Sequence, residues 1–210
     1  MLSNSVLLVV SIHSTPEPEY MASVLRALGS PLKNISLFFN LIPGVPDISK
    51  ARNKLASDFL KTEYEYLLMT DCDMGFMPMD IERLVGRGVQ LIGGLYRHKV
   101  PMPSYVLNSI VDGFNPADGV LQEVKYVGTG FMLIHRSVLE SMVLAYPEIQ
   151  YNPDANENPG QQYGFFDSMI FEGRRLSCDW AFCQRWRNLE GRVFVDCARL
   201  IPHYGKACFA

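Results

Sequence analysis

The feature that most constrains the fold is the alternation of short apolar runs with amphipathic stretches over the first third of the chain. Apolar runs at residues 6–12, 35–40 and 64–70 have the length of strands. Residues 16–29 and 48–59, between them, repeat apolar side chains at the three- and four-residue spacing of a helix. This alternation predicts an α/β fold. We expect helices packed against a central β-sheet.

Residues suited to helix ends flank both predicted helices. Thr15 has the side chain of an N-cap, and Pro16 would then take the first helical position, where its missing N–H is tolerated. Gly29 fits the end of this helix, and Asp47 fits the N-cap of the next one. The second helix is expected to bury one apolar face, formed by Ile48, Ala51, Leu55 and Phe59.

Strand-like runs become more frequent further along the chain. They lie at residues 89–96, 104–107, 121–127, 130–134 and 192–197, with helical patterns at 137–145 and 177–190. Residues 151–164 are rich in Asn and Pro and predict a long surface loop, a kind of segment that often carries function. Because no internal repeat and no linker is present, we expect residues 1–210 to form one domain. The ending at residues 206–210 has no polar tail, which fits one domain of a longer protein with further domains.

Charge and cysteine content argue against several classes of protein. The 19 basic and 22 acidic side chains give a net charge of −3, whereas nucleic-acid binding needs a clustered basic surface. The apolar run at residues 6–10 is far shorter than a membrane span, and no signal-peptide pattern accompanies it. The five cysteines include no C-x-x-C pair, which argues against a disulfide framework and a zinc knuckle. We expect a reduced, cytoplasmic protein without a membrane span.

Two acids stand where the third predicted strand ends. Asp71 and Asp73 follow the run at 64–70 with only Cys72 between them. Ligands of open α/β sheets bind at the carboxyl ends of strands, and carboxylate oxygens suit Mg²⁺ or Mn²⁺. The same acids also fit an ordinary strand-end turn. A phosphatase of the haloacid dehalogenase type is a weaker alternative, because that family carries its acids on the first strand and has Thr or Val where this chain has Gly75.

Further polar residues are expected at the same edge of the sheet. Arg52 lies early in the second predicted helix, where a guanidinium can bind a phosphate or a base. His13, Ser14 and Thr15 follow the first strand, where hydroxyls and N–H groups can meet a nucleotide. Gly130 lets a backbone pass close to a ligand. Each also has a structural explanation: a surface ion pair for Arg52, a helix cap for Thr15, a tight turn for Gly130.

The last third of the chain adds an imidazole, an ammonium and a carboxylate. His203 can complete a Mn²⁺ site, and Lys206 can meet a phosphate as a point charge. Asp179 stands in the first turn of a predicted helix and fits a general base aimed at a hydroxyl. The alternatives are a partly buried structural histidine, a surface lysine, and an acid that the helix dipole favours.

The order of these segments resembles that of glycosyltransferases of the GT-A fold. The segments are the first strand, Ala51-Arg52-Asn53, residues 67–73, residues 127–133, Asp179 with Phe182-Cys183, and His203-Tyr204-Gly205. The resemblance covers nearly the whole chain and rests on the ordered set. It implies an α/β fold of the GT-A type, a single Rossmann-like domain with a mixed central β-sheet flanked by helices. It is similar in particular to the N-terminal glycosyltransferase domain of a multidomain chlorella-virus protein, which would place the protein in the host cytoplasm.

The resemblance implies a role for each matching residue. Asp73 matches the direct Mn²⁺ or Mg²⁺ ligand, Asp71 the acid that contacts the ribose or the metal, and His203 the histidine that completes the metal site. Asp179 falls where inverting members keep their base, although Cys178 replaces the acid usual before it, and the H-x-G with a nearby Lys is closer to retaining members. The nucleotide-sugar pocket would comprise Ser11, His13, Ser14, Thr15, Arg52, Asp71, Cys72 and Gly130, with Lys206 as a diphosphate contact.

The function implied is a metal-dependent glycosyltransferase of the hexosyltransferase type, which moves a sugar from a nucleoside-diphosphate donor, expected to be a UDP-sugar, to a glycan hydroxyl. Trp180, Tyr163 and Phe165 are expected to offer surfaces on which sugars stack. Two alternatives remain: a non-catalytic module that binds nucleotide sugars or carbohydrate on the same fold, and a nucleotidyltransferase. The second is disfavoured because no glycine-rich loop follows the first strand.

Overall fold

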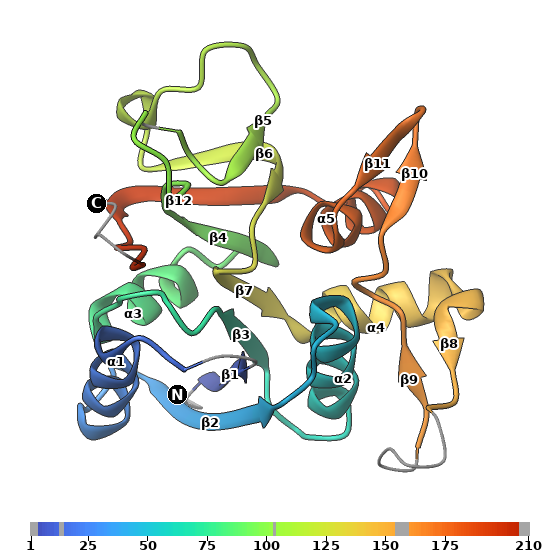
Figure 1. The fold of residues 1–210 in the computed structure, drawn as a ribbon, viewed down its shortest axis with the longest axis horizontal. Coiled ribbons are helices and arrows are strands. Elements are labelled where there is room, and N and C mark those ends of the chain that lie inside the picture. The colour runs from blue at the N-terminus through green and yellow to red at the C-terminus, as the bar shows by residue number, and fades with distance from the viewer. Residues whose placement is uncertain (1–3, 13–14, 103, 154–159, 206–210) are drawn as a thin grey trace.

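The computed structural model describes residues 4–12, 15–102, 104–153 and 160–205. An eight-stranded β-sheet is its largest element, with the strand order β2-β1-β3-β7-β4-β12-β6-β5 (Figure 1). The strands are β1 (Asn4–Ile12), β2 (Ile35–Pro43), β3 (Tyr66–Thr70), β4 (Leu91–Leu95), β5 (Leu107–Ser109), β6 (Leu121–Val127), β7 (Phe131–His135) and β12 (Val193–Leu200). β2, β1 and β3 are parallel, as are β4 and β12, whereas β7 is antiparallel to β3 and β4, and β6 is antiparallel to β12. The sheet is mixed, as predicted, and the fold is of the Rossmann-like α/β type.

Helices cover both faces of this sheet. They are α1 (Pro18–Gly29), α2 (Ile48–Leu60), α3 (Pro78–Gly86), α4 (Arg136–Ala145) and α5 (Cys178–Asn188). One hydrophobic cluster contains buried side chains of α2, α4 and α5, and the other contains those of α1 and α3. None of the helices in the described ranges is long and apolar enough to cross a membrane.

Strand β1 shows why both layers form. Leu7 and Val9 belong to the cluster with α2, α4 and α5, whereas Val6, Leu8 and Val10 belong to the cluster with α1 and α3. Successive side chains of a strand point to opposite faces, so a continuous apolar run satisfies two layers at once. This burial on both sides explains why the run at residues 6–12 reads as apolar throughout rather than alternating.

The predicted helix ends are partly confirmed. The Asp47 side chain accepts hydrogen bonds from the N–H groups of Ser49 and Lys50, which confirms it as the N-cap of α2. The prediction for Thr15 is wrong, because α1 begins at Pro18 and Glu17 is its N-cap residue. Glu17 has extended backbone angles, φ −63° and ψ 138°, as expected for a residue that precedes proline. The helix therefore cannot reach back to Pro16.

Several short elements were not predicted. Helix α3 follows the acidic turn after β3, and two small antiparallel pairs join β8 (Gln150–Tyr151) to β9 (Gln162–Tyr163) and β10 (Met169–Phe171) to β11 (Arg174–Leu176). The turns η1 (Pro116–Asp118) and η2 (Pro147–Ile149) complete the described elements. The predicted loop at 151–164 is thus bounded by a strand pair. The parallel strands β1, β3 and β4 end at one edge of the sheet, which is where polar residues gather.

Candidate functional site

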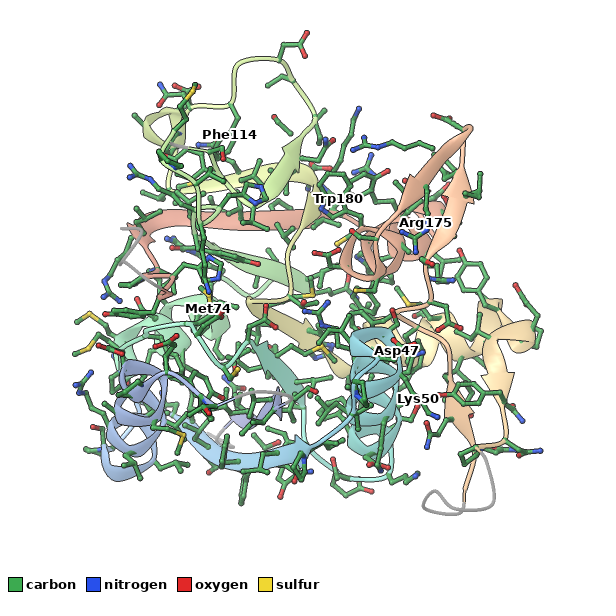
Figure 2. The ribbon with its side chains drawn as sticks, in the orientation of Figure 1. Asp47, Lys50, Met74, Phe114, Arg175 and Trp180 are labelled. Atoms are coloured by element: carbon green, nitrogen blue, oxygen red, sulfur yellow. The ribbon has the colours of Figure 1, made fainter. Side chains whose placement is uncertain are left out.

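The turn after β3 is paired with the last described segment of the chain. Asp71 and Asp73 stand in this turn, and Met74 forms an antiparallel bridge with His203. The Tyr204 N–H donates to the carbonyl oxygen of Asp73 at 2.8 Å. Met74, labelled in Figure 2, lies where the turn after β3 contacts the segment that contains His203. This backbone pairing brings the imidazole of His203 beside the second of the two acids.

Asp73 lies between two nitrogen-bearing side chains. Its Oδ2 is 2.5 Å from Lys99 Nζ, and its Oδ1 is 3.5 Å from His203 Nε2. Nδ1 of His203 is 2.8 Å from the carbonyl oxygen of Arg97. Because a carbonyl can only accept, Nδ1 carries a proton, and Nε2 is the ring nitrogen that faces Asp73.

This geometry fits a cation between Asp73 and His203. Asp73 Oδ1 is buried and forms no hydrogen bond of good geometry with any described residue. Either a proton or a metal ion can lie between Nε2 and this carboxylate oxygen. The carboxylate oxygen and the imidazole nitrogen both suit Mn²⁺. The 3.5 Å approach of these two atoms is therefore compatible with a shared divalent ion.

The electrostatics at Asp73 keep it ionised. Burial alone would raise the pKa of this carboxyl, but its interactions with His203 and Lys99 outweigh burial and lower the pKa below its ordinary value. Asp73 is therefore an anion at neutral pH, which is the form that binds a metal ion.

Asp71 has a different partner. No group of three or more His, Cys, Asp or Glu side chains within the described ranges is arranged to hold a metal ion, so Asp71 does not join Asp73 and His203 in one cluster. Its Oδ1 instead lies 3.1 Å from Nη2 of Arg52. The prediction that Asp71 contacts a ribose is compatible with this position, since its carboxylate remains 38% exposed.

Arg52 links α2 to the N-terminus of α5. Its guanidinium donates to Asp71 and, through Nη1, to Cys178 Sγ at 2.8 Å. Burial acts to lower the pKa of Arg52, but the charges of Asp71, Cys178 and Asp179 together raise it above its ordinary value. Arg52 is a permanent cation at the centre of an otherwise acidic group. It holds the turn after β3 against the start of α5.

Asp179 stands at the first turn of α5, as predicted. Its Oδ1 accepts hydrogen bonds from the Ser177 hydroxyl and from the N–H of Trp180. No described residue hydrogen-bonds to its Oδ2, which is left to meet a ligand. The charge of Asp179 also acts on Arg52 and Tyr96, which places it in the same electrostatic environment as Asp71.

Two unpaired hydroxyls point into a small recess beside Arg52 and Asp71. Ser11 Oγ, at the end of β1, and Thr129 Oγ1 are buried without a hydrogen-bond partner among the described residues, and both residues line this recess. Buried polar groups without partners are rare and suggest that water or a ligand group completes them. The predicted pocket residue Ser11 therefore lies next to the Arg52–Asp71 pair.

Gly130 has a packing role in addition to its predicted one. A side-chain Cβ at this position would stand 2.8 Å from the ring of Tyr96, so only glycine fits. The Gly130 N–H donates to Tyr96 Oη at 3.0 Å. Burial, with the charge of Asp71, raises the pKa of Tyr96 well above its ordinary value, so this hydroxyl stays protonated.

The remaining predicted pocket residues are less informative. His13, Ser14 and Lys206 lie outside the described residues. Thr15 is exposed, and Cys72 is buried between the two acids.

The expectation that aromatic rings offer sugar-stacking surfaces is wrong for Phe165, which is 0% exposed and belongs to the core. Trp180 is partly exposed, stacks on Tyr126, and has the guanidinium of Arg174 4.7 Å from the centre of its ring. Tyr163 is partly exposed and packs against Phe165. For Trp180 and Tyr163 the expectation stays a prediction.

Lys99 was not singled out from the sequence. It follows β4, whose carboxyl end lies at the same edge as those of β1 and β3. The rule that placed Asp71 and Arg52 at this edge could also have found Lys99.

Comparison with known proteins supports the fold. No protein-family model matches the sequence, and no curated protein sequence matches it. Among solved structures, the viral protein A197 from STIV superposes with a TM-score of 0.59 at 15% identity, over 95% of this chain and 85% of that one. A 4-diphosphocytidyl-2C-methyl-D-erythritolsynthase from Anaerococcus prevotii DSM 20548 gives a TM-score of 0.39 at 10% identity, over 72% of this chain and 80% of that one, a likeness too low to support an argument.

Neither structure is described as a chlorella-virus glycosyltransferase, so the narrower resemblance stays a prediction. The likeness to A197 shows that this chain shares the fold of a viral protein along nearly its whole length.

Proposed function

We propose that this chain is a metal-dependent glycosyltransferase that uses a nucleoside-diphosphate sugar, with UDP as the expected nucleotide. The observation that carries the proposal is the approach of Asp73 Oδ1 to His203 Nε2 at 3.5 Å. It lies at the carboxyl ends of parallel strands, where open α/β sheets bind nucleotides. The GT-A resemblance of the sequence points to the same pair.

The chain's own residues have distinct tasks in this proposal. Asp73 and His203 would hold a Mn²⁺ or Mg²⁺ ion, which when bound supplies positive charge to the leaving diphosphate. Arg52 fixes the Asp71 carboxylate, which is then oriented to accept hydrogen bonds from a ribose. The hydroxyls of Ser11 and Thr129 are buried beside that carboxylate in a recess of about 10 Å³, which is the size of one water molecule.

Asp179 is the proposed group that receives the acceptor's proton. Two hydrogen bonds to Oδ1 hold the carboxylate in place, which leaves Oδ2 to accept the proton of an attacking hydroxyl. An Asp179 acting in this way predicts inversion at the sugar carbon. A retaining course would need a different role for Asp179, such as orientation of the acceptor.

The test is the release of UDP from a panel of UDP-sugars in the presence of Mn²⁺. We expect the wild-type protein to release UDP and Asp73→Asn to lose at least a hundredfold of this activity while keeping its thermal stability within a few degrees. Glu140→Gln is the matched control, because Glu140 is an exposed acid on α4, 3.8 Å from Arg136. Full Mn²⁺-dependent turnover by Asp73→Asn would refute the metal assignment. Donor binding without UDP release would favour a non-catalytic module, and pyrophosphate release would favour a nucleotidyltransferase.

A further inference from the structure

A second cavity lies beside the edge strand β5, away from the metal pair. Its volume is about 510 Å³. The walls come from β5, the following loop, β6 and the β10–β11 hairpin, and the side chains that matter here are Tyr105, Asn108, Ser109, Phe114, Lys125 and Arg174. We call this cavity the β5 pocket. Figure 2 labels Phe114 on the loop and Arg175 on the hairpin that bound it.

The β5 pocket is positively charged in a protein that carries a net charge of −3. Lys125 and Arg174 line it, against one acid, Asp112. Among the described residues, neither Lys125 nor Arg174 has an acidic partner within ion-pair distance. Both side chains are exposed, so each is available to an anion.

The rest of the pocket is suited to a hydroxylated ligand. Asn108 and Ser109 contribute an amide and a hydroxyl, which can donate to and accept from sugar hydroxyls. Tyr105 and Phe114 pack edge to face on one side of the pocket, with ring centres 5.7 Å apart, but the surface that lines the pocket is mostly polar. A mostly polar lining with two cations matches an acidic sugar better than a neutral one.

A chain of contacts joins the pocket to Asp179. The guanidinium of Arg174 lies 4.7 Å from the centre of the Trp180 ring, and Trp180 stacks on Tyr126 at 5.4 Å. The N–H of Trp180 in turn donates to Asp179 Oδ1 at 3.0 Å. Figure 2 shows Trp180 where the start of α5 meets β6. One short segment thus positions both the proposed base and a wall of the pocket.

We propose that the β5 pocket binds the glycan acceptor and selects one that carries an anionic group, a carboxylate or a phosphate. The identification of the ligand as a glycan acceptor rests on the proposed function. The binding of an acidic saccharide can be measured whether or not the protein is a transferase. Arg174 is fixed by its stacking on Trp180, and its planar guanidinium can bind either anion through two hydrogen bonds. Lys125 adds a second charge from the neighbouring strand.

The experiment compares glucuronic acid, glucose 6-phosphate and glucose as probes, without metal or nucleotide, by chemical-shift changes in the amide spectrum of the full chain. We expect the two acidic probes to bind at least tenfold more tightly than glucose and to shift Asn108 and Ser109. Arg174→Gln and Lys125→Gln should each weaken acidic binding by about five- to tenfold. The two acidic probes distinguish a carboxylate from a phosphate as the preferred group.

Two matched variants separate recognition from general charge and from misfolding. Arg175→Gln removes the adjacent charge, which does not line the pocket and hydrogen-bonds to Ser168, and it should leave binding unchanged. Arg174→Lys keeps the charge and should retain more binding than Arg174→Gln. Equal affinity for glucose and the acids, or equal losses in Arg174→Gln and Arg175→Gln, would overturn the proposal. Acidic binding at the pocket without UDP release by any donor would instead reject the transferase function and leave the binding site standing.

Discussion

At the scale of single residues, Asp73 is the centre of the site because it is ion-paired to Lys99 on one oxygen and faces His203 with the other. Lys99 acts as an internal counter-ion for the carboxylate that we assign to the metal. The side chain of Lys99 is 32% exposed and lies against Gly205. A Cβ added at Gly205 would stand 3.1 Å from Lys99 Cδ. The ammonium therefore competes with a metal ion for the charge of this carboxylate, if Asp73 and His203 hold one.

Removal of Lys99 should therefore strengthen the binding of the metal alone. We expect Lys99→Met to bind Mn²⁺ about fivefold more tightly than the wild type, equivalent to about 1 kcal/mol for a partly exposed ion pair. Calorimetric titration with Mn²⁺ in the absence of nucleotide measures this. Lys54→Met is the control, since Lys54 forms a pair of the same 2.5 Å length with Asp58, on α2. An unchanged Mn²⁺ affinity in Lys99→Met would show that the ammonium does not compete with the metal.

At the scale of elements, helix α3 is fixed to β12 by a buried ionic network. Asp196 is 0% exposed, and its two oxygens lie 2.7 Å from Arg83 Nε and 2.6 Å from Arg87 Nε. Asp80, also 0% exposed, pairs with Arg83 and Arg199. Loss of one member leaves buried charges without a counter-ion, which usually costs about 3–5 kcal/mol.

Asp196→Asn should accordingly lower the free energy of unfolding by about 3 kcal/mol or more, as measured by urea denaturation. The exposed Asp118, which accepts only a local hydrogen bond from Asn115, provides the control. Asp118→Asn is expected to change the stability by less than about 0.5 kcal/mol. If Asp196→Asn lowers the free energy of unfolding by less than about 1 kcal/mol, then Arg83 and Arg87 form other ion pairs or are hydrated in the variant.

The same elements show what the sequence could predict. The runs that became β1 and β3 were found because their side chains are largely buried on both faces and read as apolar, whereas the edge strand β2 was found although only Ile35 in it is buried. Helix α3 was missed because it spans nine residues and buries only Ile81, Leu84 and Val85 of its apolar side chains, too short a repeat to detect. The start of α1 was misplaced because both Pro16 and Pro18 suit the first position of a helix. Glu17, which follows Pro16, has extended backbone angles, so the helix begins at Pro18.

At the scale of the whole molecule, the candidate site is assembled by contacts between distant parts of the chain. Carboxyl ends of parallel strands share an edge, so the convergence of Arg52 and Asp71 followed from the pattern alone, whereas Ser11 was named only through the glycosyltransferase resemblance. The position of His203 did not, since it depends on the pairing of Met74 with the end of the chain. The recess at Thr129 and the ion pair of Lys99 likewise depend on strand order, which a single sequence does not specify.

This assembly makes a thermal test of the donor site possible. Because one sheet contains strands from the first to the last described segment, a ligand that binds the site should stabilise the whole domain. UDP with Mn²⁺ at about one hundred times the dissociation constant should add about 2.7 kcal/mol, or about 5–11 °C in Tm for a chain of this size.

We expect UDP alone and Mn²⁺ alone to produce much smaller shifts than the two together, because Asp73 and His203 would supply only two of the ligands that a divalent ion needs and a diphosphate would supply others. Differential scanning fluorimetry at fixed concentrations measures the four conditions. Asp73→Asn should abolish the cooperative part of the shift while Glu140→Gln keeps it. If the shifts of UDP and Mn²⁺ are merely additive, the nucleotide and the metal do not share a site, and the assignment of Asp73 and His203 to the donor diphosphate is wrong.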